Sequence, residues 1–533
     1  MATVELYDTT LRDGAQQEGI SLSVEDKIKV TLKLDEIGIH YIEGGWPGAN
    51  PKDNEFFQKA QELRLSHAKL VAFGSTRRAK GKTQEDPVLL SLLQAGTPVI
   101  TLVGKSWDLH VTKVLETTLE ENLEMIADSI RFLKSEGRKV FFDAEHFFDG
   151  YKANPEYALR TLTVAESAGA DCVILCDTNG GTLPQQVSEV IPMITRHLST
   201  ALGIHAHNDA DTAVATSLAA VRSGATQVQG TINGYGERCG NANLLSVIAD
   251  LQLKMGLPCI TEDQLARLTE VSRFVSEVVN IPPNNVQPYV GINAFTHKAG
   301  LHASAVAKVN LSYEHVPPGV VGNTQQILIS EMAGRSNVAF KLRELGLDTQ
   351  VTREQIPQLI KVIKERENQG FQYEIAEASF ELLARRCIPE YKPPFELVDY
   401  MVLVEKHRRS ESDDIGAGVL AEATVKVRLG SGIAHTAGQG NGPVNALDSA
   451  LRRALLEEYP ELEKVKLLDY RVRVVNQEGG TGAVVRVIIE STDGEEVWHT
   501  VGASGNIIEA SWMALSDALE FWLARRGLTL DTP

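Results

Sequence analysis

Two hydrophobic patterns alternate along the first half of the chain. Short runs rich in β-branched and aromatic residues recur, and the longer segments between them carry apolar residues three and four positions apart. The first pattern predicts buried β-strands, and the second predicts helices with one apolar face. The predicted strands are 4–10, 41–46, 69–74, 99–104, 140–145, 172–178, 203–208 and 226–233.

Strands that alternate with helices in this number and over this length are typical of a (β/α)8 TIM barrel. A doubly wound sheet is the alternative, although it rarely needs eight strands. One of the helices, over 23–38, is expected to begin at a capping box formed by Ser23 and Asp26. We therefore predict an α/β fold in which residues 1–258 form a TIM-barrel catalytic domain.

The rest of the chain shows two further patterns. From 259 to 395 the periodicity is helical, with a break at "IPPNNVQP", which predicts helical linker subdomains. From 396 to 533 strands return, and "HTAGQGNGPVNALDSALRRALLE" (435–457) aligns without a gap with "HTVGASGNIIEASWMALSDALEF" (499–521). This internal repeat predicts a C-terminal α+β domain with two similar halves.

Charge and composition exclude several classes of protein. The chain has 52 Lys and Arg against 70 Asp and Glu, a net charge of −18, so we expect no nucleic-acid partner. No apolar run approaches the roughly 20 residues of a membrane span, and no signal-peptide pattern precedes "VELYDTT", so we expect no membrane association and a cytoplasmic location. The five cysteines have neither disulfide-framework nor CxxC spacing.

Polar residues stand where the predicted barrel strands end, which is where this fold places its chemistry. Residues i and i+2 of a strand face the same side, so the two imidazoles of "GIHAHNDADT" are expected to point the same way. In strand order the candidate residues are Arg12 and Asp13, Glu43, Glu145, Asp177 and Thr178, His205 and His207, and Asn241.

Barrel closure brings the ends of the seventh, eighth and first strands together, so His205, His207, Asp13 and Asn241 can converge on one point. Two nitrogens and two oxygens without a thiolate suit a divalent metal ion such as Mn2+, Mg2+, Co2+ or Zn2+. For the histidine pair alone, two satisfied core histidines are the alternative. Asp209 is expected to orient one of the imidazoles.

Several motifs together resemble those of the DRE-TIM metallolyases. They are "YDTTLRDGAQ" (7–16), "YIEGGWP" (41–47), "FDAEHFFDG" (142–150), "CDTNGGTLP" (176–184), "HAHND" (205–209), "NGYGERCGNANL" (233–244) and "FTHKAGLHASAV" (295–306). Within that family the chain is similar to the acyl-CoA-condensing branch of 2-isopropylmalate, homocitrate and citramalate synthases, and most of all to the long citramalate synthases. The resemblance implies condensation of acetyl-CoA with pyruvate to (R)-citramalate, in isoleucine biosynthesis.

The resemblance also implies roles for individual residues. The metal ligands would be Asp13, His205, His207 and Asn241. Arg12 would bind and polarise the keto oxygen, Glu43 would hold Arg12, and Thr178 would hydrogen-bond the carboxylate of the acceptor. Glu145 would be the base, and His302 with Tyr313 would supply a second acid/base group from the partner subunit of a homodimer. Outside the family context, Glu145 could form a salt bridge at the rim and His302 could be a surface histidine.

The C-terminal repeat resembles the regulatory domain of 2-isopropylmalate synthases, which implies feedback by an end-product amino acid, here isoleucine. A domain used only for dimerisation is the alternative. The rival activities are a sibling transferase acting on 2-oxoisovalerate or 2-oxoglutarate, a carbon–carbon lyase of the same barrel, and an inactive sensor or scaffold. Asp143 and Leu102 are candidate walls of the keto-acid pocket, and Cys239 is expected to pack rather than react.

Overall fold

The computed structural model of the chain describes residues 4–298, 302, 305–306, 308–309, 312–405, 420–475, 480 and 482–528. Contacts between residues divide it into two compact units, Met1–Phe295 with His315–Gln325, and Thr296–Glu314 with Gln326–Pro533. The domain boundaries expected at 258 and 395 stay a prediction, and the helices of the predicted linker segment are shared between the two units. In the described ranges, no helix combines the length and apolar character needed to cross a membrane.

The first unit contains a closed barrel of eight parallel strands in sequential order. The strands are β1 (Glu5–Asp8), β2 (Tyr41–Gly45), β3 (Lys69–Ser75), β4 (Val99–Lys105), β5 (Lys139–Glu145), β6 (Cys172–Asp177), β7 (Ala201–Ala206) and β8 (Gln227–Gly230). Strand β8 pairs in parallel with β1, with Leu6 opposite Val228, and this pairing closes the barrel. The predicted TIM barrel is therefore confirmed, and each strand lies where the hydrophobic pattern places it.

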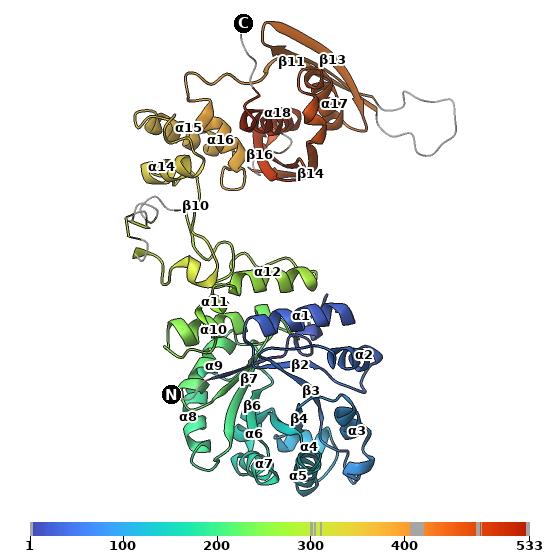
Figure 1. Cartoon of the computed structure of the whole chain (residues 1–533). Coiled ribbons are helices and arrows are strands. Elements are labelled where there is room, and N and C mark those ends of the chain that lie inside the picture. Colours follow the sequence, from blue (N-terminus) through green and yellow to red (C-terminus); the bar gives the residue numbers. More distant parts are fainter. Residues whose placement is uncertain are drawn as a thin grey trace, which may run out of the picture. The chain divides into compact units, whose positions relative to one another are not determined.

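Helices surround the barrel as in Figure 1. They are α1 (Val24–Glu36), α2 (Pro51–Ala60), α3 (Pro87–Gln94), α4 (Asp108–Lys113), α5 (Leu119–Ser135), α6 (Phe147–Ala153), α7 (Pro155–Ala168), α8 (Pro184–Ile194), α9 (Ala213–Arg222) and α10 (Leu244–Leu253), followed by α11 (Glu262–Leu265) and α12 (Leu268–Val278). Helix α1 begins at the expected capping box of Ser23 and Asp26. The largest apolar core lies between strands and helices, and a smaller one, which includes Tyr7 and Phe141, fills the barrel interior.

The second unit begins with short elements and three helices. Strands β9 (Thr296–His297) and β10 (Gln326–Ile327) pair in parallel. Helices α14 (Arg335–Glu344), α15 (Ile356–Asn368) and α16 (Glu377–Arg385) follow. Their apolar sides, with Leu342, Leu359 and Phe380, share one core with Val501 and Ala503 of the C-terminal domain.

The C-terminal repeat folds into two similar halves (Figure 1). The first half consists of β11 (Glu396–Glu405), β12 (Leu420–Leu429), β13 (Gly432–Gly440) and α17 (Pro443–Leu456). The second half consists of β14 (Lys466–Val474), β15 (Val485–Thr492), β16 (Val497–Ser504) and α18 (Ile507–Arg525). In each half three antiparallel strands precede one helix. The predicted α+β domain with an internal repeat is confirmed.

The same contact joins helix to strand in both halves. The Thr436 hydroxyl donates to the carbonyl of Ala450 at 2.7 Å, and the Thr500 hydroxyl donates to the carbonyl of Ala514 at 2.7 Å. Such a bond requires the helix backbone to approach the last strand closely, which a small residue on the strand permits. The aligned threonines therefore mark equivalent positions in space as well as in sequence.

Gly502 allows this close approach in the second half. A Cβ atom added at Gly502 would lie 2.0 Å from the carbonyl oxygen of Ala510, so Gly502→Ala must displace α18 from β16. We expect a loss of about 1–3 kcal/mol of stability, measured by calorimetry as a lower unfolding temperature. Gly505→Ala is the control, because its nearest new neighbour would be 3.7 Å away. Equal destabilisation by both variants would contradict the role of Gly502.

Candidate active site

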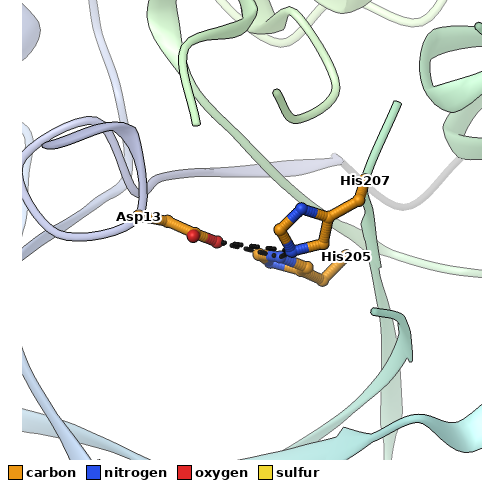
Figure 2. A group of neighbouring side chains, drawn as sticks. All are labelled: Asp13, His205 and His207. Carbon is orange, nitrogen blue, oxygen red and sulfur yellow. Dashed lines mark hydrogen bonds and ion pairs between the residues drawn. The ribbon is translucent and has the colours of Figure 1, made fainter. Parts of the chain in front are cut away.

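Two histidines and an aspartate converge at the C-terminal end of the barrel (Figure 2). His205 lies on β7 and His207 lies one residue beyond it, and their Nε2 atoms are 3.4 Å apart. Asp13 belongs to the turn after β1, and its Oδ2 lies 3.2 Å from Nε2 of His205 and 3.8 Å from Nε2 of His207. All three side chains are buried. Barrel closure thus brings together residues nearly 200 positions apart in the chain.

Asn241 reaches this cluster from the segment that follows β8. It does not end β8; it follows a loop that folds back so that residue 241 pairs with His207 in an antiparallel bridge. Its side-chain nitrogen donates to Asp13 at 3.0 Å and lies 3.2 Å from Nε2 of His205. Its side-chain oxygen is buried and, within the described part of the chain, accepts no hydrogen bond.

The electrostatics of the cluster suit a cation. Burial opposes charge on Asp13, but Arg12 and His205 outweigh it and hold the pKa of Asp13 well below its usual range. Burial and the neighbouring His205 lower the pKa of His207 to about 4, so its imidazole is neutral near pH 7. Burial lowers the pKa of His205, yet the hydrogen bond and charge of Asp13 raise it overall. A metal ion at this point would compete with the His205 proton, as it does at other histidine ligands.

His205 is oriented by a residue that the sequence reasoning missed. Gln229 on β8 places its side-chain oxygen 2.9 Å from Nδ1 of His205, and its nitrogen donates to Asp143 at 3.1 Å. Because a carboxamide oxygen only accepts, Nδ1 carries a proton, and Nε2, which faces Asp13, is the atom that would bind a cation. The available signal was strand parity, since Gln229 is an inward-facing polar residue on the strand beside His205.

The expected role of Asp209 is wrong. Its carboxylate accepts two hydrogen bonds from Arg238, at 2.7 and 2.9 Å, and the charge pair fixes the loop beside the cluster. Asp209 follows His207 by only two residues, but its side chain points toward Arg238 and not toward either imidazole.

Arg12 is locked in place beside Asp13. Its Nε donates to Glu43 at 2.5 Å, and its guanidinium carbon lies 3.9 Å from the ring centroid of Phe73. Glu43 is fully buried and also accepts from the hydroxyl of Tyr7 at 2.5 Å. Burial would lower the pKa of Arg12, but Glu43 and Asp13 raise it above its ordinary value. The structure therefore brings Arg12 and Glu43 together as a buried ion pair.

Glu145 and Thr178 stand at neighbouring strand ends. Glu145 ends β5 and forms an ion pair with Lys105, which ends β4 and was not singled out from the sequence. The hydroxyl oxygen of Thr178 accepts the backbone N–H of His146 at 2.9 Å. Because a hydroxyl that accepts can still donate, the Thr178 proton remains available to a ligand.

These residues surround a cavity of about 520 Å³. Among its lining residues are Arg12, Asp13, Glu145, Thr178, His205 and His207. Asp143 lines it as expected, but Leu102 does not, because Leu102 is buried in the core between barrel and helices. Strand parity puts the next residue, Val103, on the cavity wall instead.

Three other residues were singled out from the sequence. His302 and Tyr313 belong to the second unit, where their rings stack with centroids 4.2 Å apart. Tyr313 is 51% exposed. Cys239 is exposed in the loop before Asn241, so the expectation that it packs is wrong.

Models of known families match three successive stretches of the chain. The HMGL-like model matches residues 3–275, which include the whole barrel. The homocitrate synthase post-HMGL domain-like model matches residues 289–370, and the LeuA allosteric (dimerisation) domain model matches residues 374–523.

Curated relatives match over nearly the full length. The (R)-citramalate synthase of Aquifex aeolicus is 54% identical over 98% of this chain and 98% of its own. The (R)-citramalate synthase of Geobacter sulfurreducens is 53% identical with the same coverage. The 2-isopropylmalate synthase of Methanocaldococcus jannaschii is 31% identical over 98% of this chain and 95% of its own. The chain belongs to the (R)-citramalate synthase family, built on an HMGL-like barrel.

Proposed function

We propose that this protein condenses acetyl-CoA with pyruvate and hydrolyses the resulting thioester, releasing (R)-citramalate and CoA. The observation that carries the proposal is the buried Asp13, His205 and His207 cluster beside the locked Arg12 in one cavity. About half of all residues are identical to those of (R)-citramalate synthases over nearly the full length, which favours pyruvate over larger keto acids. A 2-isopropylmalate or homocitrate synthase activity is the second candidate.

The donor set fits a divalent cation held by Asp13, His205 and His207, with Asn241 as a fourth ligand. Asn241 would ligate through its amide oxygen after the amide turns over, because its nitrogen faces Asp13 and His205 while its buried oxygen accepts no hydrogen bond in the described ranges. Nitrogen and oxygen donors without a thiolate suit Mn2+, Mg2+, Co2+ or Zn2+. The cation would supply Lewis-acid polarisation of the keto oxygen when bound.

Arg12, Glu43 and Thr178 would bind and orient the keto acid. The Arg12 guanidinium would donate to the keto oxygen and stabilise the negative charge that grows there as the carbonyl carbon is attacked. Glu43 would keep that guanidinium in one orientation. The free hydroxyl proton of Thr178 would donate to the substrate carboxylate.

Glu145 would act as the base. Its carboxylate would take a proton from the methyl carbon of the acetyl group, and that carbon would then bond to the keto carbon of pyruvate. The oxygen of the former ketone then takes up a proton, for which His302 and Tyr313 of the partner subunit are the candidate acid/base groups. Water finally adds to the thioester carbonyl, the C–S bond breaks, and CoA leaves as the thiol, so the overall condensation is irreversible.

The C-terminal domain would dimerise the chain and bind isoleucine as a feedback effector. Helices α17 and α18 each cover one face of their sheet, while apolar side chains on the outer strands stay exposed. Met401 is 62% exposed, Ile433 56% and Leu468 53%. Apolar surface of this extent normally marks an interface, and a second copy of the chain is the occupant that the dimerisation-domain match favours.

Metal binding provides the first test of the site. His205→Ala should lose bound metal, and Gln229→Leu should weaken metal affinity by about 10–100-fold because it removes the support of His205. Metal content by mass spectrometry and affinity by competition with a chelator measure both effects. Gln227→Leu is the matched control, since Gln227 lies on the same face of β8 but hydrogen-bonds Glu5. Full metal content in His205→Ala would refute the site.

The substrate is tested with purified protein, Mn2+, acetyl-CoA and a panel of keto acids. Pyruvate should release free thiol fastest, and 2-oxoisovalerate and 2-oxoglutarate should react far more slowly. Each additional methylene group changes binding in a fitted pocket by about 1–3 kcal/mol. Faster turnover of 2-oxoisovalerate than of pyruvate would replace the proposed activity by that of a 2-isopropylmalate synthase.

Glu145→Gln tests the base. The amide cannot accept the methyl proton, so kcat should fall by about 100-fold or more, whereas the affinity for pyruvate should change little. Lys105→Met is the companion variant, because it removes the ion-pair partner but leaves the carboxylate. Steady-state kinetics separate kcat from KM, and an unchanged kcat in Glu145→Gln would remove Glu145 from this role.

A further inference from the structure

One basic segment beside the cavity has no role in the reaction described above. Residues 77–82 read "RRAKGK" and directly follow β3, so they lie at the same end of the barrel as the metal cluster. Arg77 and Arg78 line the cavity, although the chain as a whole carries a net charge of −18. Cations gathered at the mouth of a cavity in an acidic protein attract anionic ligands to that place.

Carboxylates fix the backbone of this segment. Arg77 is buried, and its guanidinium pairs with Glu121 at 2.7 Å. The backbone N–H of Arg78 donates to Asp86 at 2.9 Å, and the backbone N–H of Lys80 donates to Glu121 at 2.7 Å. Lys80 is held at a φ of 59°, a left-handed conformation that these contacts stabilise. The segment therefore has a set shape before any ligand arrives.

The Arg78 guanidinium takes no part in these contacts. It is exposed at the cavity, and across the described ranges no hydrogen bond or ion pair engages its side chain. The nearby carboxylates are already occupied, Glu121 by Arg77 and Asp86 by backbone N–H groups. A free guanidinium presents planar N–H donors that match the oxygens of a phosphate group.

A continuous wall joins Arg78 to the reacting centre. Arg12 lies over the ring of Phe73 at 3.9 Å, and from Phe73 the chain runs through Ser75 to Arg78. All four residues line the same cavity. Its remaining wall near this side includes the apolar residues Val103, Leu115 and Met125. An acyl group held near Arg12 could thus extend past apolar side chains toward a cation.

We propose that Arg78 binds a phosphate group in the nucleotide portion of CoA. Val103, Leu115 and Met125 then lie along the pantetheine arm. This inference rests on the proposed function, because it assigns the position of the acyl donor in the same cavity. Unlike the metal ligands, Arg78 would act only in binding and would touch neither the keto acid nor the thioester.

Arg78→Gln tests the assignment, because glutamine keeps a long polar side chain but removes the charge. KM for acetyl-CoA should rise by about tenfold, the usual worth of one charge-assisted hydrogen bond. The KM for pyruvate should stay as in the unmodified protein. With S-acetylpantetheine, which has no nucleotide phosphate, the variant and the unmodified protein should have equal kcat/KM. Arg64→Gln is the control, since Arg64 is an exposed arginine before the opposite end of β3.

Acetyl-3′-dephospho-CoA identifies the phosphate that is bound. If Arg78→Gln still raises KM for this analogue, Arg78 contacts the pyrophosphate; if the effect disappears, it contacts the 3′-phosphate. An unchanged KM for acetyl-CoA in Arg78→Gln overturns the inference and leaves the proposed function standing. If no keto acid supports turnover, the proposed function fails. The inference is then tested separately, by calorimetric titration of Arg78→Gln and the unmodified protein with CoA. A tenfold weaker affinity in the variant supports it, and equal affinity overturns it.

Discussion

The pairing of the last barrel strand with the first is the constraint on which the site depends. Asp8 lies opposite Gly230 in this ladder, and the backbone of Thr9 donates to Gly230 at 2.8 Å. The backbone N–H of Asp13 then donates to Thr9 at 2.8 Å, so the turn that carries the first metal-ligand candidate is tied to this seam. Without that closure, Asp13 and His205, which are far apart in the sequence, would not lie close together in space.

The seam also requires a close approach of two backbones. A Cβ atom at Gly230 would lie 2.4 Å from the carbonyl oxygen of Ala242, in the segment that carries Asn241. Ala242 itself donates its N–H to Ala206 at 2.9 Å, which draws the segment against the end of β7. The absence of a side chain at residue 230 thus lets a third stretch of chain reach the point where the first and seventh strands already meet.

The interior of the barrel mouth holds more charge than folding alone would favour. Glu43 is completely buried, Asp13 is nearly so, and Arg12 is 15% exposed, although each ion loses hydration on burial. Compensation comes from the pairing of Arg12 with Glu43 and from the Tyr7 hydroxyl. For Asp143 the cost of burying a negative charge appears as a raised pKa, because burial raises the pKa of Asp143 to about 7. An arrangement of this cost is typical of a site kept for chemistry rather than for stability.

The sequence predicts the barrel well because hydrophobic period and strand length are local properties. It also identifies Asp13, His205 and His207, since strand ends converge in this fold whatever the loops do. It misses Gln229 and misassigns Asp209, because a hydrogen-bond partner depends on which side chain a neighbouring strand offers. The prediction that Leu102 lines the cavity is wrong for a related reason. Successive strand residues face opposite sides, so an error of one residue exchanges the cavity wall for the outer core.

Sequence motifs do not predict which keto acid is the substrate, and the reason is physical. In the proposed reaction, Arg12, Thr178 and the metal-ligand cluster would contact the keto oxygen and the carboxylate, which every 2-keto acid shares. Discrimination must therefore come from walls that carry no charge. Phe73 is fixed against the Arg12 guanidinium, and Trp46, whose ring packs edge-on against Phe73, lines the same cavity. In the proposed reaction, packing of such side chains would exclude a larger keto acid through steric overlap, and the shape of the wall rather than its charge would set specificity.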